Sequence, residues 1–217
     1  MRRDFSNSLI AIVLFTLVFG LAYPLAFTGV AQVLFPSKAD GSKIHRDGKV
    51  VGSKLIAQDF RMPVLDKNGK SKTDPDGNPV LTADPRYFQP RPSQTGYDPS
   101  VTFFSNLGPN STDERDLVKA NIAAYVGLEK KYDPTLTESS VPADAVTQSA
   151  SGVDPHISKA NAEIQAHRIA AVRHLPIDRV ETLIDDNTDG RFLGIFGEPG
   201  VNVLQLNLAV DKEAPSA

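Results

Sequence analysis

Residues 9–27 read LIAIVLFTLVFGLAYPLAF, and this stretch decides how the chain is organised. No charged side chain occurs from Phe5 to Ser37. A helix rises about 1.5 Å per residue, so roughly 20 residues cross a hydrocarbon core of about 30 Å. A core helix of a soluble protein would normally carry a polar face, and this stretch has none. The pattern predicts a transmembrane helix over about residues 9–29, inside a membrane anchor formed by residues 1–35.

The same stretch is predicted to stay attached to the chain. It is longer than the roughly 7–15 apolar residues of a typical signal peptide, and no small-x-small cleavage site follows it. Arg2 and Arg3 favour a cytoplasmic N-terminus, although four basic residues follow the span, namely Lys38, Lys43, Arg46 and Lys49. The rule that basic flanking residues stay in the cytoplasm applies only weakly to long translocated domains. The soluble part is therefore expected outside the cytoplasm.

The composition excludes several classes of function. The 217 residues carry a net charge of −3 with no basic stripe, so a nucleic-acid partner is not expected. Cysteine is absent, which removes disulfides, thiolate catalysis and cysteine-ligated metal sites. His156, His167 and His174 do not form a known ligand spacing, so no metal site is expected either.

Residues 36–217 are predicted to form a small soluble domain of the mixed α/β class. Strands are expected where β-branched residues gather, and helices where apolar residues recur every three or four positions. The expected elements are a strand or hairpin at 48–58, a helix capped by Ser111 or Thr112, a short element at 143–146, a helix from Ser158 to about His174, an amphipathic helix from Ile177 that Gly190 can end, and a strand over 201–210.

Residues 61–83 differ from their surroundings and are predicted to be a solvated insertion with two turns. They contain Asn-Gly and Asp-Gly pairs, which favour tight turns with positive φ. A calcium loop needs acidic residues at positions one, three and five and glycine at six. Counting from Asp66 places Ser71 sixth, and counting from Asp74 places glycine fourth. The spacing therefore fails for calcium.

Residues 84–99, DPRYFQPRPSQTGYDP, contain four prolines, which exclude a long helix. Two interpretations of this extended segment stay open. Its aromatic side chains Tyr87, Phe88 and Tyr97 can pack it onto the core. They can also form a partner surface, because arginine beside aromatic residues is common in interfaces.

SASGVDPHIS, residues 149–158, places serine, aspartate and histidine close together. A catalytic triad usually converges from distant elements, and Ser151 lacks the G-x-S-x-G context. The favoured interpretation is a turn followed by a helix with Ser158 as its cap. A third possibility is that hydroxyl groups, glycine and the helix N-terminus hold an anion.

The chain also carries, in one order, GLAYPL, VAQVLFP, DGKVVGSKLIAQDF, DPRYFQPRPS, SNLGPN, VTQSASGVDPHIS, QAHRIAAVR and GEPGVNVLQLNLAV. In these motifs it resembles the C subunit of the bacterial potassium-transporting Kdp P-type ATPase. Two departures stand out. Residues 61–83 look like an insertion, because the family usually joins the Gln-x-Phe motif almost directly to DPRYF. His167 stands where the family commonly has proline.

The resemblance implies a non-catalytic accessory subunit of an ATP-driven potassium import complex, a single-pass protein of the inner membrane. Its implied partners are an ATP-hydrolysing pump subunit, a potassium-channel-like subunit and the lipid bilayer. The family is described as a catalytic chaperone that raises the affinity of the pump subunit for ATP. An extracytoplasmic domain could not touch cytosolic ATP. The predicted orientation therefore conflicts with the implied chaperone role. The alternatives are a membrane-anchored extracytoplasmic hydrolase using Ser151, Asp154 and His156, or a solute-binding protein.

No covalently bound cofactor is expected, but ATP is a possible ligand. Gln165 is the preferred contact, because its carboxamide offers a donor and an acceptor in one plane to an adenine edge. Ser149, Ser151 and Gly152 would then face the phosphates near the start of the same helix. The alternative is that Gln165 is an exposed helix residue without a ligand.

Overall fold

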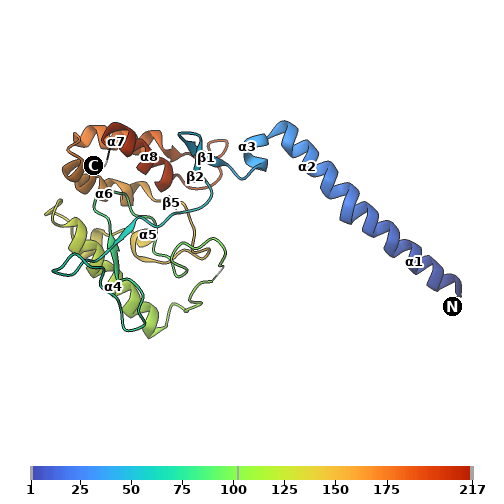
Figure 1. Cartoon of the computed structure of the whole chain (residues 1–217), viewed down its shortest axis with the longest axis horizontal. Coiled ribbons are helices and arrows are strands. Elements are labelled where there is room, and N and C mark those ends of the chain that lie inside the picture. Colours follow the sequence, from blue (N-terminus) through green and yellow to red (C-terminus); the bar gives the residue numbers. More distant parts are fainter. Residues whose placement is uncertain (1, 102, 216–217) are drawn as a thin grey trace. The chain divides into compact units, whose positions relative to one another are not determined.

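The computed structural model describes residues 2–101 and 103–215, and the chain divides into two compact units (Figure 1). The first unit is Met1–Ser53 and the second is Lys54–Ala217. An apolar N-terminal helix is followed by a domain of helices and small sheets. The predicted fold class is confirmed. The first unit contains the predicted anchor, residues 1–35, together with a short helix and a hairpin.

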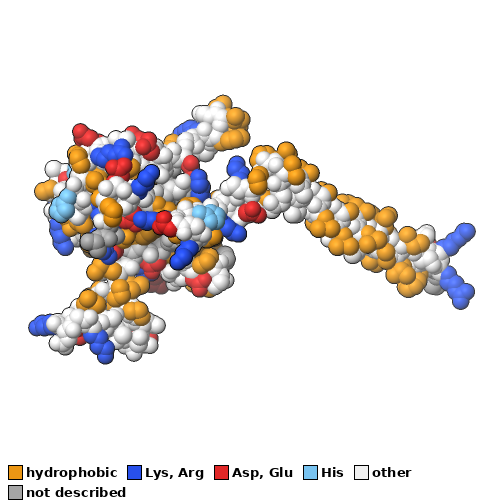
Figure 2. All heavy atoms as spheres, turned by 45° about the horizontal axis from the view of Figure 1, so that its top comes forward, with side chains coloured by type: hydrophobic (Ala, Val, Ile, Leu, Met, Phe, Trp, Pro, Cys, Tyr) orange, Lys and Arg blue, Asp and Glu red, His pale blue; other side chains and the backbone are white. Residues whose placement is uncertain are grey.

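The N-terminal helix is longer than predicted. It runs without a break from Arg2 to Leu34 as α1 (Arg2–Leu17), the π-helical turn η1 (Val18–Ala22) and α2 (Tyr23–Leu34). At about 1.5 Å per residue, its 33 residues are long enough and apolar enough to cross a membrane. Hydrophobic side chains cover it, with basic ones at its N-terminal end (Figure 2). Pro24 explains the wider turn, because its ring lacks an N–H and clashes with a normal α-helical carbonyl.

The rest of the first unit is α3 (Pro36–Ala39) and an antiparallel hairpin of β1 (Lys43–Arg46) and β2 (Lys49–Ser53). Asp47 and Gly48 form the turn, and both have positive φ, at 51° and 75°. An Asp-Gly pair suits this geometry, whose twist matches that of the strands. The predicted hairpin exists, but β1 lies before the predicted range of 48–58.

The core of the second unit lies among three helices and one small sheet. The helices are α6 (Lys159–Arg173), α7 (Ile177–Asp186) and α8 (Val203–Glu213). The sheet has the order β5 (His156–Ile157), β7 (Gly200–Asn202) and β6 (Thr188–Asp189), and both pairings are antiparallel. Fully buried side chains from these elements, including Ile169, Ile184 and Leu206, form one cluster around Phe88.

The remaining elements of the second unit are β3 (Arg61–Pro63), β4 (Leu81–Ala83), α4 (Thr112–Glu129), the 3-10 turn η2 (Glu138–Ser140) and α5 (Ala143–Val146). The caps predicted for two helices are confirmed. The hydroxyl oxygen of Ser111 accepts from the N–H of Glu114, and that of Ser158 accepts from the N–H of Asn161. The helix α7 ends at Asp186, capped by Asn187, and therefore stops before Gly190.

The predicted strand over 201–210 is wrong beyond Asn202. Asn202 instead caps α8, because its side chain accepts from the N–H of Gln205. Val203, Leu206 and Val210 are buried at a spacing of three and four residues, which is the period of a helix. The apolar pattern of residues 203–210 is therefore that of a helix.

Residues 61–83, predicted to be an insertion, form the β3–β4 pair, and the two predicted turns lie between the strands. One carboxylate oxygen of Asp66 accepts from the N–H groups of Asn68 and Lys70. Asp74 does the same for the N–H groups of Asp76 and Asn78. These acidic side chains thus stabilise their own turns.

Candidate functional site

An extended segment, residues 84–92, crosses the second unit and is held mainly by side chains. The N–H of Phe88 donates to Oδ1 of Asn207 (2.8 Å), and its carbonyl accepts from Nδ2 of the same residue (2.9 Å). The next residue, Gln89, makes the matching pair with Oε1 (2.7 Å) and Nε2 (3.1 Å) of Gln165. Carboxamides from α8 and α6 thus take the place of neighbouring strands. We call this arrangement the amide clasp.

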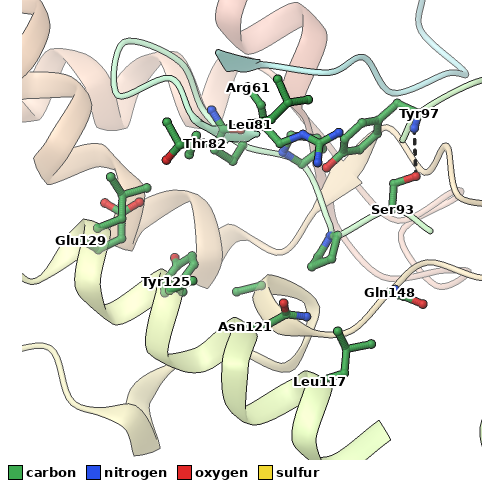
Figure 3. Close-up of a pocket in the computed structure, with 17 residues that line it drawn as sticks. Arg61, Leu81, Thr82, Ser93, Tyr97, Leu117, Asn121, Tyr125, Glu129 and Gln148 are labelled. Atoms are coloured by element: carbon green, nitrogen blue, oxygen red, sulfur yellow. Dashed lines mark hydrogen bonds between the residues drawn. The ribbon is translucent and has the colours of Figure 1, made fainter. Parts of the chain in front are cut away.

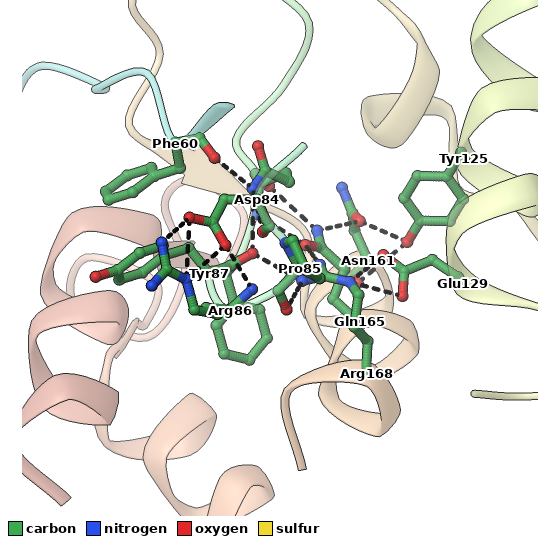
Figure 4. A network of polar contacts seen from close by, with 12 residues as sticks. Phe60, Asp84, Pro85, Arg86, Tyr87, Tyr125, Glu129, Asn161, Gln165 and Arg168 are labelled. Carbon is green, nitrogen blue, oxygen red and sulfur yellow. Dashed lines mark hydrogen bonds and ion pairs between the residues drawn. The ribbon is translucent and has the colours of Figure 1, made fainter. Parts of the chain in front are cut away.

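The amide clasp also includes a buried ion pair, which completes the hold on the segment (Figure 4). Arg168 is fully buried, and its Nε donates to both carboxylate oxygens of Glu129, at 3.0 and 3.1 Å. Its Nη1 donates to the carbonyls of Pro85 (2.8 Å) and Tyr87 (2.9 Å), and its Nη2 donates to Oε1 of Gln165 (2.8 Å). Burial raises the pKa of Glu129 above its usual range, against the opposing effect of Arg168.

A second arginine fixes the start of the segment. The Nε of Arg173 donates to the carbonyl of Arg86 (2.9 Å), and its Nη2 pairs with Asp211 (2.8 Å). The guanidinium of Arg173 lies 4.8 Å from the centre of the Tyr87 ring. Burial alone would raise the pKa of Asp84, but hydrogen bonds from Arg86 reverse this and hold the pKa below its usual range.

The N-terminus of α6 already holds a carboxylate. The two oxygens of Asp144 accept from the N–H (2.8 Å) and the hydroxyl (2.8 Å) of Ser158. Nδ2 of Asn161 donates to the same carboxylate (3.0 Å), and Oδ1 of Asn161 accepts from the hydroxyl of Tyr125 (2.9 Å). The favourable end of the helix dipole is thus satisfied from within the chain. Burial raises the pKa of the Tyr125 hydroxyl.

A cavity of about 490 Å³ lies between α4 and the extended segment (Figure 3). Leu117, Asn121, Tyr125 and Glu129 line it from α4, at helical spacing. The facing wall comes from residues 81–97 together with Arg61 and Gln148. Both apolar and polar side chains therefore line the cavity.

Two of the polar groups that line the cavity are the hydroxyl of Tyr97 and the carboxamide of Gln148. The hydroxyl of Tyr97 donates to the carbonyl of Arg91 (3.0 Å), and burial raises the pKa of Tyr97 to about 12. The Gln148 Nε2 donates to Gln94 (2.8 Å), whereas its Oε1 is buried without a partner among the described residues. An unpaired acceptor beside a cavity can take a hydrogen bond from a neutral donor.

The stretch 149–158 forms a turn and a helix cap, as favoured from the sequence. The hydroxyl oxygen of Ser151 accepts from the N–H of Val153 (3.2 Å), and Asp154 accepts from the N–H of His156 (3.0 Å). The His156 ring lies against Asp189 (3.3 Å). In the described part of the chain, no hydrogen bond joins Ser151 to His156. This geometry lacks the nucleophile–base contact of a hydrolase.

Of the four residues predicted to bind nucleotide, Gln165 and Ser149 contact the extended segment. Gln165 is 1% exposed, so its interpretation as an exposed helix residue is wrong. The Ser149 N–H donates to the carbonyl of Pro92 (3.3 Å), and the carbonyl of Gly152 accepts from the hydroxyl of Ser93 (2.6 Å). Ser151 is exposed.

Close packing explains the choice of glycine at position 152. Its φ of 72° lies in the left-handed region, and a Cβ there would come within 2.6 Å of Oγ1 of Thr95.

Sequence reasoning missed several residues of the clasp, namely Gln89, Glu129, Arg168 and Asn207. A usable signal existed for Asn207, since it interrupts the otherwise apolar run 206–210. A polar residue in such a run is expected to need a buried partner. The partner itself is 119 positions away in the chain, so no local pattern identifies it.

Comparison with known proteins shows similarity over nearly the whole chain. The family described as "K+-transporting ATPase, c chain" matches residues 5–212. The Potassium-transporting ATPase KdpC subunit of Mycobacterium tuberculosis (strain ATCC 25618 / H37Rv) is 42% identical over 214 residues, covering 98% of this chain and 100% of the relative. The proteins of the same name from Beijerinckia indica and Rhodospirillum rubrum are 43% and 44% identical, each over 219 residues. They cover 99% and 100% of this chain, and 96% and 100% of their own lengths.

Proposed function

The chain belongs to the family of the K+-transporting ATPase c chain, and from this premise we propose that it is a non-catalytic accessory subunit of a potassium import complex. In this proposal ATP hydrolysis and the potassium path belong to a pump subunit and a channel-like subunit. The observation that carries it is the match over residues 5–212, which includes the apolar helix and the folded domain together. The turn geometry of Ser151 and His156 argues against the rival hydrolase.

Purification of the complex through a tag on its pump subunit tests this proposal. The full-length chain should co-purify in detergent, and omission of the chain should lower potassium-stimulated ATP hydrolysis. Adding back the purified chain should restore that activity. An isolated chain that hydrolyses esters, and loses this activity on Ser151→Ala, would support the hydrolase instead.

We propose that the chain spans the inner membrane once, with its N-terminus in the cytoplasm and residues 36–217 outside. The apolar helix from Arg2 to Leu34 and the basic pair Arg2 and Arg3 support this orientation. Protease added to intact spheroplasts should then digest the second unit. Digestion only after lysis would reverse the orientation.

For the reverse orientation we propose instead that the chain assists ATP binding by the pump subunit, with contact through Gln165, Ser149, Ser151 and Gly152. Adenine could reach Gln165 only by replacing the backbone of Gln89, and phosphate at α6 would compete with Asp144. Contact with ATP would therefore require the extended segment to open and the orientation to be reversed.

Calorimetric titration of the full-length chain with ATP distinguishes this contact from simple loosening of the segment. Gln165→Ala should abolish binding, whereas Asn207→Ala, which breaks the other half of the clasp, should retain it. Equal binding by both variants and the unaltered chain would remove Gln165 from the proposal, and a chain that binds no ATP would remove the direct contact.

A further inference from the structure

The connection between β6 and β7 presents four large apolar side chains to solvent. Phe192, Leu193, Ile195 and Phe196 each leave 62–74% of their surface exposed. They lie within five consecutive positions of the chain. Contiguous exposed apolar side chains of this size usually mark an interaction site. We call residues 192–196 the apolar tip.

The tip is an ordered turn. The N–H of Phe192 donates to the carbonyl of Phe196 (2.8 Å), and the reverse bond is 3.0 Å long. The N–H of Ile195 also donates to the carbonyl of Phe192 (3.2 Å). Leu193 at the apex has a φ of 53°, a left-handed conformation that branched apolar residues rarely adopt. The backbone thus holds apolar side chains outward in a defined shape, which lowers the entropy lost on binding.

The stretch of chain that contains the tip, residues 177–200, is acidic. From Ile177 to Gly200 the chain carries six acidic side chains and two basic ones, a net charge of −4. One of the basic residues, Arg191, is paired with Glu198 at the base of the tip (2.8 Å). Lys159 from α6 pairs with Asp185, which still leaves this region negative. An excess of acidic side chains in the chain next to the apolar tip disfavours the anionic surface of a bilayer and favours a basic protein surface.

We propose that the apolar tip inserts into an apolar recess with a basic rim on another subunit of the transport complex. This inference rests on the proposed function, because that function supplies the partner. Aromatic side chains that fill a pocket dominate the energetics of many interfaces, while the surrounding charges set orientation and association rate.

Co-purification of the assembled complex tests the tip. Leu193→Asn combined with Ile195→Thr removes apolar surface, and asparagine tolerates the left-handed conformation at position 193. We expect about a tenfold or greater loss of the chain from the tagged complex. The matched control is Leu65→Asn, an exposed apolar residue in the β3–β4 turns, and it should co-purify normally. The thermal unfolding of both variants should match that of the unaltered chain.

Photo-cross-linking separates a protein partner from lipid. A benzophenone side chain in place of Leu193 should cross-link to one identified subunit of the complex, and the same group in place of Leu65 should not. Asp186→Lys should also weaken co-purification, because it reverses the charge of an exposed acidic residue in the stretch that precedes the tip. Cross-links to lipid alone, or full co-purification of the tip variant, would overturn the inference. If the unaltered chain itself fails to co-purify, the proposed function is wrong as well.

Discussion

The amide clasp and the apolar tip invert the usual distribution of polar and apolar groups. The clasp buries two carboxamides and an ion pair, whereas the tip leaves four large apolar side chains in solvent. The clasp is stable because the carboxamides of Gln165 and Asn207 use both their donor and acceptor atoms. The tip has no such cover within the second unit. From polarity alone, the carboxamides would be expected in solvent and the apolar side chains in the core. The difference shows that a side chain is buried where the fold supplies partners for its atoms.

The largest expected effect comes from breaking the ion pair of the clasp. Arg168→Ala leaves Glu129 buried without its partner, and we expect a loss of about 3–5 kcal/mol in the free energy of unfolding. Urea unfolding of the full-length chain in detergent, followed by circular dichroism, measures this loss. Arg179→Ala removes an arginine from an exposed ion pair with Glu213 and should change stability little.

A second substitution measures how much a carboxamide of the clasp contributes to stability, apart from the ion pair. Asn207→Ala leaves the N–H and carbonyl of Phe88 buried and unpaired, so we expect a loss of about 1–3 kcal/mol. Hydrogen exchange at the Phe88 amide should accelerate at the same time. Asn106→Ala, which removes an exposed bond to Phe104, is the control and should leave that exchange rate unchanged.

The pH dependence tests the burial of Tyr97, whose hydroxyl donates to the carbonyl of Arg91 in the extended segment. Burial raises the pKa of Tyr97 to about 12, above the value of about 10 expected in the unfolded chain. The unfolded chain therefore loses this proton first, and the contribution of Tyr97 to stability is complete below pH 10 and is lost as the pH rises towards 12. Unfolding measured across this range should show a shallower alkaline loss for Tyr97→Phe than for the unaltered chain.

The smallest effect on stability is expected at the tip. Leu193→Asn should change the free energy of unfolding by no more than about 0.5 kcal/mol, because the side chain is mostly exposed and the turn geometry suits asparagine. Thermal unfolding in detergent measures this change. A large loss would show that the tip packs within the chain, and would remove its contrast with the clasp.

Several features could be predicted from the sequence because their causes are local. The uncharged stretch from Phe5 to Ser37 predicts the long apolar helix, and Pro24 does not interrupt it. Ser111 and Ser158 mark two helix starts, since a cap acts within three residues. The strand predicted over 201–210 failed because a short apolar run is compatible with either period.

What the sequence by itself determined about this protein is its division into an apolar helix and a mixed α/β domain, and the family to which it belongs. Only the tertiary structure decided that Gln165 holds Gln89, and that Asn207 holds Phe88 from the other helix. These pairs are 76 and 119 positions apart. The physical reason is that a carboxamide has the same bonding capacity wherever it lies, so its partner depends on which backbone groups the folded core leaves unpaired.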